Sequence, residues 1–187
     1  NFLLDHNNSE DSSPINEEGA KYIKMAALKG NVDAISKYTI LLLDGIGVPA
    51  NKEKAIFYFK HGVTKGSKEI MHLYGKLLID GTKVPMNKEE GVRLIKMAAD
   101  KGNYQAMNDY AMMLSSGQYV PMNKEEGARY MKMAADHNYL PSISNYVYML
   151  ANGIGIPANK ELALRYVKIA INKGSASAMQ IYGTMLD

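Results

Sequence analysis

Two pairs of adjacent glutamates are the first candidates for chemistry in this chain of 187 residues, because two carboxylates that flank one bond can act as general acid and base. The pairs are Glu89–Glu90 and Glu125–Glu126, and each follows an Asn-Lys dipeptide. Neighbouring side chains on a helix point roughly 100° apart, so neither pair can flank a single substrate bond. We expect both pairs to lie at solvated helix N-termini.

The four histidines are the next candidates, as metal ligands or as general bases. They lie far apart in sequence and none has the His-x-x-x-His spacing of a helical metal site. They are His6, His61, His72 and His137. We expect His61 to be a packed imidazole, and we expect His72 to face the surface, either as a contact residue or merely exposed.

Glycine-rich segments and nucleophiles complete the search for catalytic groups. Gly45-Ile46-Gly47 and Gly153-Ile154-Gly155 are superficially similar to phosphate-binding loops, but no strand precedes them and the third glycine is missing. The chain has no Cys, which excludes disulfides, thiolate nucleophiles and Cys-containing zinc sites, and it has no Ser-x-x-Lys motif. The sequence therefore predicts no catalytic, cofactor-binding or metal-binding residue.

Charge and hydropathy also exclude whole classes of partner. There are 22 Lys and Arg residues against 19 Asp and Glu, a net charge of +3 that is too small to favour nucleic-acid binding. The longest apolar run is Ile40–Leu43, far shorter than the roughly 18 residues of a membrane span. We expect neither nucleic-acid binding nor membrane insertion.

An internal repeat of 36 residues organises the chain. The tripeptide Asn-Lys-Glu begins at Asn51, Asn87, Asn123 and Asn159. Tyrosines, prolines and glycines keep the same spacing, and the tyrosines stand at Tyr38, Tyr74, Tyr110, Tyr146 and Tyr182. A fixed period of this size predicts a solenoid of stacked repeats.

Each period predicts two antiparallel helices. In the first copy the apolar residues of 33–44 follow one helical face, and the helix stops at Gly45. Asn51 then caps a second helix, Lys52 to Lys65, which ends at Gly66. In two other copies a glutamate three residues after the capping asparagine, Glu90 or Glu126, predicts a capping box.

Small and large residues predict how the helices pack. Ala pairs at 26–27, 98–99 and 134–135 mark close helix contacts, and the Tyr and Met residues at repeated positions are expected in the core. One copy has His61-Gly62-Val63 where its siblings have Met-Ala-Ala, which predicts looser packing. On this basis Gly62→Ala is expected to stabilise the chain by up to about 1 kcal/mol.

These motifs resemble the Sel-1-like repeat family of the tetratricopeptide-like superfamily. The resemblance rests on the pattern from Ala34 to Gly45, on Gly47-Val48-Pro49, and on Lys54-Ala55 with Tyr58-Phe59. It extends from about Ile15 to the last residue. The resemblance implies an all-α fold, a right-handed α-α superhelix of antiparallel helix pairs.

The repeat register predicts the domain organisation. Residues 1–14 are expected to be a partly ordered segment or the remnant of a preceding helix, and residues 15–187 a solenoid. Its predicted parts are a partial repeat 15–30, full repeats 33–66, 69–102, 105–138 and 141–174, and a partial repeat 177–187. Because the array stops in mid-repeat, we expect a fragment of a longer protein.

Positions that differ between the copies of the repeat, while the residues around them stay the same, are the candidates for partner contact. The resemblance implies that the first helices line a concave side, where the variable positions form one stripe of mixed polar and apolar character, typical of a protein-binding groove. The stripe comprises Ser36, Ile40, Leu43, His72, Lys76, Ile79, Asn108, Met112, Ser115, Ser144, Tyr148 and Ala151. A merely solvated face is the alternative.

The function predicted from these features is a non-enzymatic scaffold or adaptor that binds a peptide or helix of a partner protein on this face. One alternative is a regulatory segment of a larger signalling protein, for example one fused to a kinase. A remote alternative is a β-lactamase-like hydrolase, an activity assigned to Cys-rich relatives, which this Cys-free chain does not resemble. We expect a cytoplasmic location, and the oligomeric state stays open.

Overall fold

The fold comes from a computed structural model that describes residues 17–186. Over this range the chain forms ten α-helices and no strand. The helices are α1 (Glu17–Leu28), α2 (Val32–Asp44), α3 (Lys52–Thr64), α4 (Lys68–Asp80), α5 (Lys88–Asp100), α6 (Tyr104–Ser116), α7 (Lys124–Asp136), α8 (Leu140–Asn152), α9 (Lys160–Asn172) and α10 (Ala176–Leu186). The predicted segment 1–14 and His6 lie outside the described residues.

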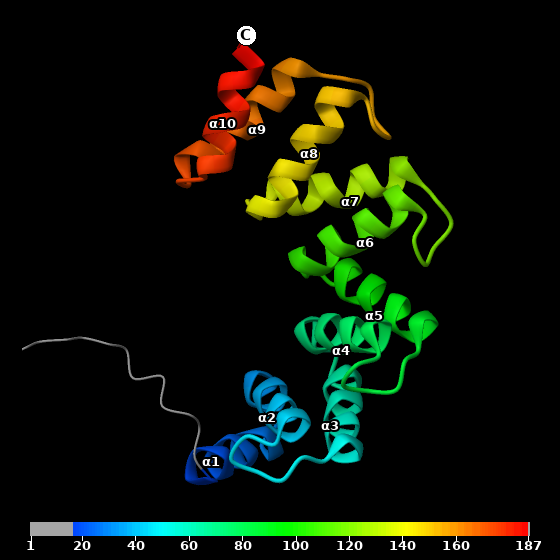
Figure 1. The fold of residues 1–187 in the computed structure, drawn as a ribbon, viewed down its shortest axis with the longest axis vertical. Coiled ribbons are helices and arrows are strands. Elements are labelled where there is room, and N and C mark those ends of the chain that lie inside the picture. Colours follow the sequence, from blue (N-terminus) through cyan, green and yellow to red (C-terminus); the bar gives the residue numbers. More distant parts are fainter. Residues whose placement is uncertain (1–16, 187) are drawn as a thin grey trace, which may run out of the picture. The chain divides into compact units, whose positions relative to one another are not determined.

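The helices keep the predicted period: the even-numbered helices from α2 to α10 and the odd-numbered helices from α3 to α9 each begin at intervals of 36 residues. The all-α repeat architecture is therefore confirmed. The chain divides into two compact units, with unit 1 ending at Tyr58 and unit 2 beginning at Phe59, so that α3 contributes to both. In unit 2 the helices from α4 to α10 follow one another as a stack (Figure 1). Between residues 17 and 186 no helix has the length and apolar character that crossing a bilayer requires.

One asparagine in each full repeat performs two tasks at the start of the second helix. Its side chain accepts a hydrogen bond from the backbone N–H three residues later, at 2.8 Å for Asn51 and 3.0 Å for Asn123. Its own backbone N–H donates to a leucine carbonyl near the end of the first helix, at 2.8 Å to Leu42 from Asn51 and to Leu114 from Asn123. The same pair of bonds recurs at Asn87 and Asn159. The asparagine thus caps one helix and ties it to its partner.

The predicted capping boxes do not form, because the backbone N–H of each capping asparagine is bonded to the first helix. A capping box requires the glutamate side chain to accept the cap residue's N–H, but that N–H is already bonded to the leucine carbonyl. The Glu90 carboxylate instead pairs with Arg93 at 2.6 Å, and Glu126 accepts from the side-chain amide of Asn123 at 3.3 Å. The hydrogen bond and charge of Arg93 hold the pKa of Glu90 below its usual value, although burial opposes this.

Four of the five repeated tyrosines lie in the core, as predicted, and the fifth, Tyr182, is half-buried. Tyr38, Tyr110 and Tyr146 are buried, and each meets a second buried tyrosine 20 residues later edge to face at 5.0–5.2 Å. The prediction for methionine was wrong at Met25 and Met133, which are exposed because their second-helix position faces outward. The equivalent residue His61 is half-buried.

The predicted loose packing at Gly62 is wrong. A Cβ built on Gly62 would lie 2.2 Å from Cδ1 and 2.8 Å from Cγ2 of Ile70 on α4. In the sibling repeats alanines such as Ala98 face a small residue, Ala106, at the position equivalent to Ile70. The volume lost at Gly62 is therefore regained by Ile70, and the contact is tight.

We now expect Gly62→Ala to destabilise the chain, because the added methyl displaces a fully buried isoleucine, at roughly 1–3 kcal/mol. Gly62→Ala combined with Ile70→Ala reproduces the Ala98 and Ala106 pair of the next repeat. The double variant should therefore lose less free energy of unfolding than the sum of the two single variants. Urea unfolding of the four proteins gives the coupling free energy. Additive losses would show that the two side chains do not share one volume.

A second contact joins consecutive second helices in only part of unit 2. The hydroxyl of Tyr130 on α7 donates to Asp100 on α5, and the hydroxyl of Tyr166 on α9 donates to Asp136 on α7. The carboxylate of each aspartate also pairs with a lysine four residues earlier, at 2.7 Å. At the equivalent positions one repeat earlier, Leu94 and Thr64 replace the tyrosine and the aspartate together.

Tyr130→Phe should lower the free energy of unfolding by about 1 kcal/mol, because it removes a hydrogen bond to a carboxylate that is partly solvated. Tyr110→Phe is the matched control, since Tyr110 is also buried but its hydroxyl makes no hydrogen bond to another described residue. Equal losses in the two variants would contradict a specific role for the Tyr130–Asp100 bond.

Candidate protein-interaction site

The predicted stripe divides into three kinds of position. The middle position of each first helix in unit 2 is exposed, with 59% of the Lys76 side chain, 53% of Met112 and 63% of Tyr148 accessible. The last position varies: Leu43 is buried, Ile79 and Ser115 are half-buried, and Ala151 is exposed. The first position packs toward a neighbouring helix, with Ser36 and Ser144 half-buried and His72 and Asn108 buried. Ile40, in the middle position of unit 1, is half-buried.

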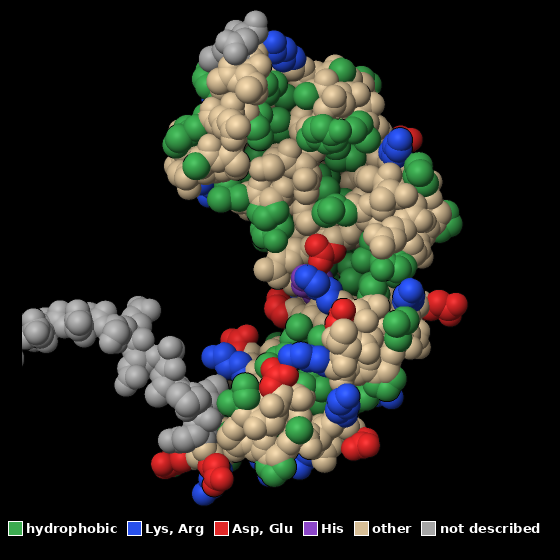
Figure 2. All heavy atoms as spheres, viewed as in Figure 1, with side chains coloured by type: hydrophobic (Ala, Val, Ile, Leu, Met, Phe, Trp, Pro, Cys, Tyr) green, Lys and Arg blue, Asp and Glu red, His purple; other side chains and the backbone are tan. Residues whose placement is uncertain are grey.

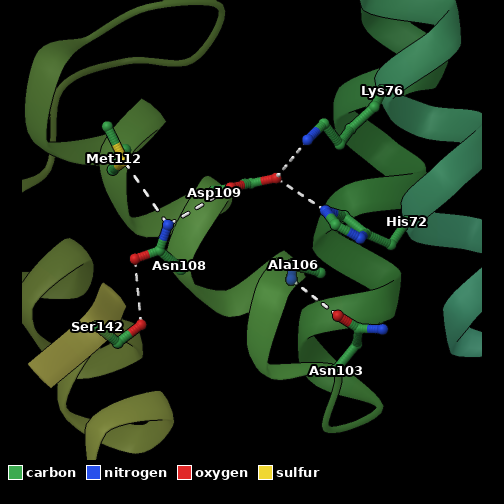
Figure 3. A network of polar contacts seen from close by, with 8 residues as sticks. All are labelled: His72, Lys76, Asn103, Ala106, Asn108, Asp109, Met112 and Ser142. Atoms are coloured by element: carbon green, nitrogen blue, oxygen red, sulfur yellow. Dashed lines mark hydrogen bonds and ion pairs between the residues drawn. The ribbon is translucent and has the colours of Figure 1, made fainter. Parts of the chain in front are cut away.

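His72 is not the surface-facing residue that the sequence predicted. It is buried on α4, and its Nε2 lies 2.7 Å from Oδ2 of Asp109 on α6 (Figure 3). Lys76, one turn further along α4, approaches the same carboxylate oxygen at 3.8 Å. The equivalent of Asp109 in the preceding repeat is Leu73, so this ion pair belongs to one junction and not to the repeat.

The polar network continues from α6 to α8 through Asn108. The side-chain oxygen of Asn108 accepts hydrogen bonds from the Ser142 hydroxyl and the Asn145 amide, both at 3.1 Å. Its amide group lies 3.7 Å from the sulfur of Met112 (Figure 3). Three consecutive first helices are therefore joined by buried polar contacts.

A cleft of about 620 Å³ lies on this network, and we call it the α4–α6 cleft. Its walls come from α4, α6 and the residue that precedes α8. They are Glu69, His72, Leu73, Lys76, Leu77, Asp80, Gln105, Asp109 and Tyr139. In the space-filling view, charged groups of both signs lie beside a histidine over this part of unit 2, with hydrophobic surface next to them (Figure 2).

The α4–α6 cleft differs from the clefts that the repeat itself produces. A cleft in unit 1 is lined by Glu17, Ala20, Lys24 and Tyr38 among others, and the residues 108 positions later line another cleft in unit 2. These are the creases between successive repeats. The α4–α6 cleft depends on His72 and Asp109, which no sibling repeat has.

Opposing effects act on the carboxyl group of Asp109. Its burial favours a higher pKa, but the hydrogen bond from His72 and the charges of His72 and Lys76 outweigh burial and hold the pKa of Asp109 below its usual value. Asp109 is therefore a charged, structural acid. The other two carboxylates of the cleft, Glu69 and Asp80, accept hydrogen bonds from Ser67 and Thr82 but pair with no cation among the described residues.

The remaining candidates for chemistry are dispersed. His137 is the C-cap residue that follows α7, and its ring stacks on Tyr104 with ring centroids 4.5 Å apart. Glu89 and Glu125 are exposed in the first turns of α5 and α7, where the prediction put them. Among residues 17–186 no three acidic or histidine side chains converge as a metal site would require.

Of the nine wall residues, the predicted stripe contained only His72 and Lys76. Sequence reasoning missed the other seven, which are Glu69, Leu73, Leu77, Asp80, Gln105, Asp109 and Tyr139. The sequence spacing could have identified Asp109. His72 and Asp109 are 37 residues apart, and so are Asn108 and Asn145, which also form a hydrogen bond. An offset of one period plus one residue joins consecutive first helices. Tyr139 was missed because it stands where Asn31, Ser67 and Asn103 cap their helices, and its side chain makes no capping hydrogen bond.

The repeated pairs of antiparallel helices, each capped and tethered by the same asparagine, define a helical-repeat solenoid. A sequence model described as the Sel1 repeat matches residues 34–67, 69–103, 105–139 and 144–175. The chain belongs to the Sel1 repeat family.

Solved structures show the same fold at low sequence identity. A Sel1 repeat protein from Oxalobacter formigenes has a TM-score of 0.83 at 24% identity, over 92% of this chain and 50% of that one. A protective antigen with an SLR fold, from uropathogenic Escherichia coli strains, has a TM-score of 0.81 at 21% identity, over 91% of this chain and 36% of that one. Cysteine rich protein B of Helicobacter pylori has a TM-score of 0.55 at 19% identity, over 71% of this chain and 95% of that one.

The chain thus spans half of the Oxalobacter protein and about a third of the Escherichia coli antigen. A search of curated protein sequences found no significant match.

Removing the Asp109 charge should destabilise the chain at neutral pH by about 1 kcal/mol, because it removes the carboxylate that His72 and Lys76 contact. A depressed pKa means that the folded state favours ionised Asp109, so its contribution is complete above the usual pKa of about 4 and is lost as the pH falls through the lower value in the folded state. The stability difference between the parent and Asp109→Asn should therefore shrink below about pH 4.

Urea unfolding from pH 7 to pH 3 measures this difference. Asp33→Asn, at an exposed acid in the first turn of α2, is the control and should show a smaller difference. A difference for Asp109→Asn that stays constant over this range would contradict the ion pair.

Proposed function

We propose that the chain is a non-enzymatic protein-interaction scaffold, and that it binds a peptide or helix of a partner protein on the face formed by α4, α6 and α8. The observation that carries the proposal is the α4–α6 cleft, a hollow of about 620 Å³ whose walls depend on residues of one junction. Its volume falls within the usual range of binding sites.

The side chains around the cleft favour recognition of a polypeptide. Buried polar contacts hold the three helices together, whereas Lys76, Met112 and Tyr148 leave more than half of their side chains accessible. Exposed Tyr and Met residues beside polar groups are typical of protein interfaces. From Glu69 to Asp80 α4 is about 16 Å long, which matches about five residues of extended chain.

The chemistry of the cleft supports binding without catalysis. A general acid or base requires a group whose pKa is near the pH at which it works, and a reactive partner within hydrogen-bonding distance. Asp109 is held ionised by His72 and Lys76, and the cleft contains no Ser, Thr or Cys that could act as a nucleophile.

The test is selection from a displayed library of random 12-residue peptides, followed by affinity measurements on synthesised winners. Changing Lys76, Met112 and Tyr148 together to Ala should weaken binding of the selected peptides at least tenfold, because these side chains lie exposed on the three helices. Circular dichroism and the unfolding curve should not change, since none of the three is buried.

The matched control changes Lys132, Met133 and Arg165 to Ala, three exposed residues on the second helices α7 and α9. Peptide binding should persist in that variant. Binding that is lost in the control and kept in the first variant would place the interaction on the second helices and contradict the proposal.

A further inference from the structure

A second cleft adjoins the α4–α6 cleft, and we call it the loop cleft. It has a volume of about 490 Å³ and shares Lys76, Asp80 and Asp109 with its neighbour. Its other walls are Ile79, Met86, Lys88, Ile95, Met113 and Tyr119. Because three residues belong to both hollows, one bound chain can occupy the two without a break.

The two clefts differ in charge. In the α4–α6 cleft Asp109 is compensated by His72 and Lys76, whereas Glu69 and Asp80 have no cationic partner among the described residues. Asp80 is also the last residue of α4, where the free carbonyl groups add negative potential. This cleft therefore favours a positively charged group.

The loop cleft offers an apolar surface with adaptable side chains. Met86 is 59% exposed and Tyr119 is 43% exposed, and the other lining residues include Ile79 on α4 and Met113 on α6, which are half-buried. Methionine side chains adjust to the shape of an apolar ligand. Lys88 also lines this cleft, and its ammonium lies 5.5 Å from the centre of the Tyr119 ring.

Tyr119 has a backbone conformation that tyrosine rarely adopts. Its φ of 67° lies in the left-handed region, as do two of the three equivalent loop residues, Gly47 at 65° and Gly155 at 71°. A side chain at this φ costs roughly 1 kcal/mol relative to glycine. The chain thus places an exposed aromatic ring at the loop cleft where glycine would be more stable, which points to a role in binding.

We infer that the partner segment carries a lysine or arginine next to a large apolar residue, with the basic group against Asp80, where the two clefts adjoin, and the apolar group in the loop cleft. This inference rests on the proposed function and adds the chemistry of the partner. Charge complementarity selects the basic residue, and the exposed Met86 and Tyr119 select the apolar one.

The experiment begins with sequencing of the peptide pool that the parent chain enriches from the random 12-residue library. We expect lysine or arginine to be enriched within five residues of Leu, Ile, Met, Phe, Tyr or Trp. The affinity of a synthesised winner should fall at least fivefold between 50 mM and 500 mM salt, because its basic group meets exposed carboxylates.

Two variants test which cleft binds the basic residue of the peptide and which binds the apolar residue. Glu69→Gln combined with Asp80→Asn should weaken binding of the winner at least tenfold, and little further loss should follow when the basic residue of the peptide becomes Gln. Glu89→Gln, an exposed acid on α5 that lines neither cleft, is the control and should bind as the parent does.

Tyr119→Gly should weaken binding at least fivefold and reduce the preference for a large apolar residue, while the urea midpoint stays equal to the parent's or rises. A fall in the midpoint would show that Tyr119 serves folding, which would overturn its assignment to binding.

The outcomes separate this inference from the proposed function. Enriched peptides that are acidic, or that bind the Glu69→Gln, Asp80→Asn variant as tightly as the parent, would overturn the inference and leave the scaffold function standing. No enrichment at all would overturn both. Concentration-dependent self-association in sedimentation that Tyr119→Gly abolishes would replace the peptide with a second copy of the chain, and would also overturn the inference.

Discussion

The asparagine at the start of each second helix carries the constraint on which the repeat depends. A helix leaves its first backbone N–H groups without partners, and the asparagine side chain accepts from one of them. Its backbone N–H is bonded to the first helix in all four full repeats, at 2.8–2.9 Å. The loop between the helices can therefore change sequence without changing how the pair closes. This freedom allows Tyr119 and Met86 at positions where the loops of the first and last full repeats carry Gly and Ala.

Differences between repeats come in compensating pairs. Ile70 fills the volume that Gly62 leaves, Tyr130 and Asp100 are replaced together by Leu94 and Thr64, and His72 has Asp109 as its partner. Each pair joins residues 8, 30 or 37 positions apart, the distances that packing against a neighbouring helix sets. A change at one position of a tightly packed junction requires a change at the other, because protein interiors leave little free volume and buried polar groups need partners.

The candidate site arises where such a pair is polar. The core between the stacked helices is largely apolar, but the His72–Asp109 pair brings polar groups to the junction of α4 and α6, where the α4–α6 cleft lies. The loop of the next repeat supplies an apolar end through Tyr119. The repeat thus provides a rigid frame, and a small number of substitutions at one junction provide its binding chemistry.

The sequence by itself determined the class of fold, the period and most helix ends. A spacing of 36 residues, helical hydrophobic faces, capping asparagines and left-handed Gly or Asn residues are local signals, and their physical effects act within one or two helical turns. The family followed from the same signals, as did the burial of four of the five repeated tyrosines.

The tertiary structure decided what depends on the neighbouring repeat. It placed His72 inside a junction, moved Met25 and Met133 to the surface, and put Ile70 against Gly62. Sequence reasoning within a single repeat could not reach these results, because the face that a helix buries is set by the helix stacked on it. Lys76, Met112 and Tyr148 of the predicted stripe are accessible, but the stripe missed most of the cleft, whose walls come from α4, α6 and Tyr139 and lie up to 70 residues apart in sequence.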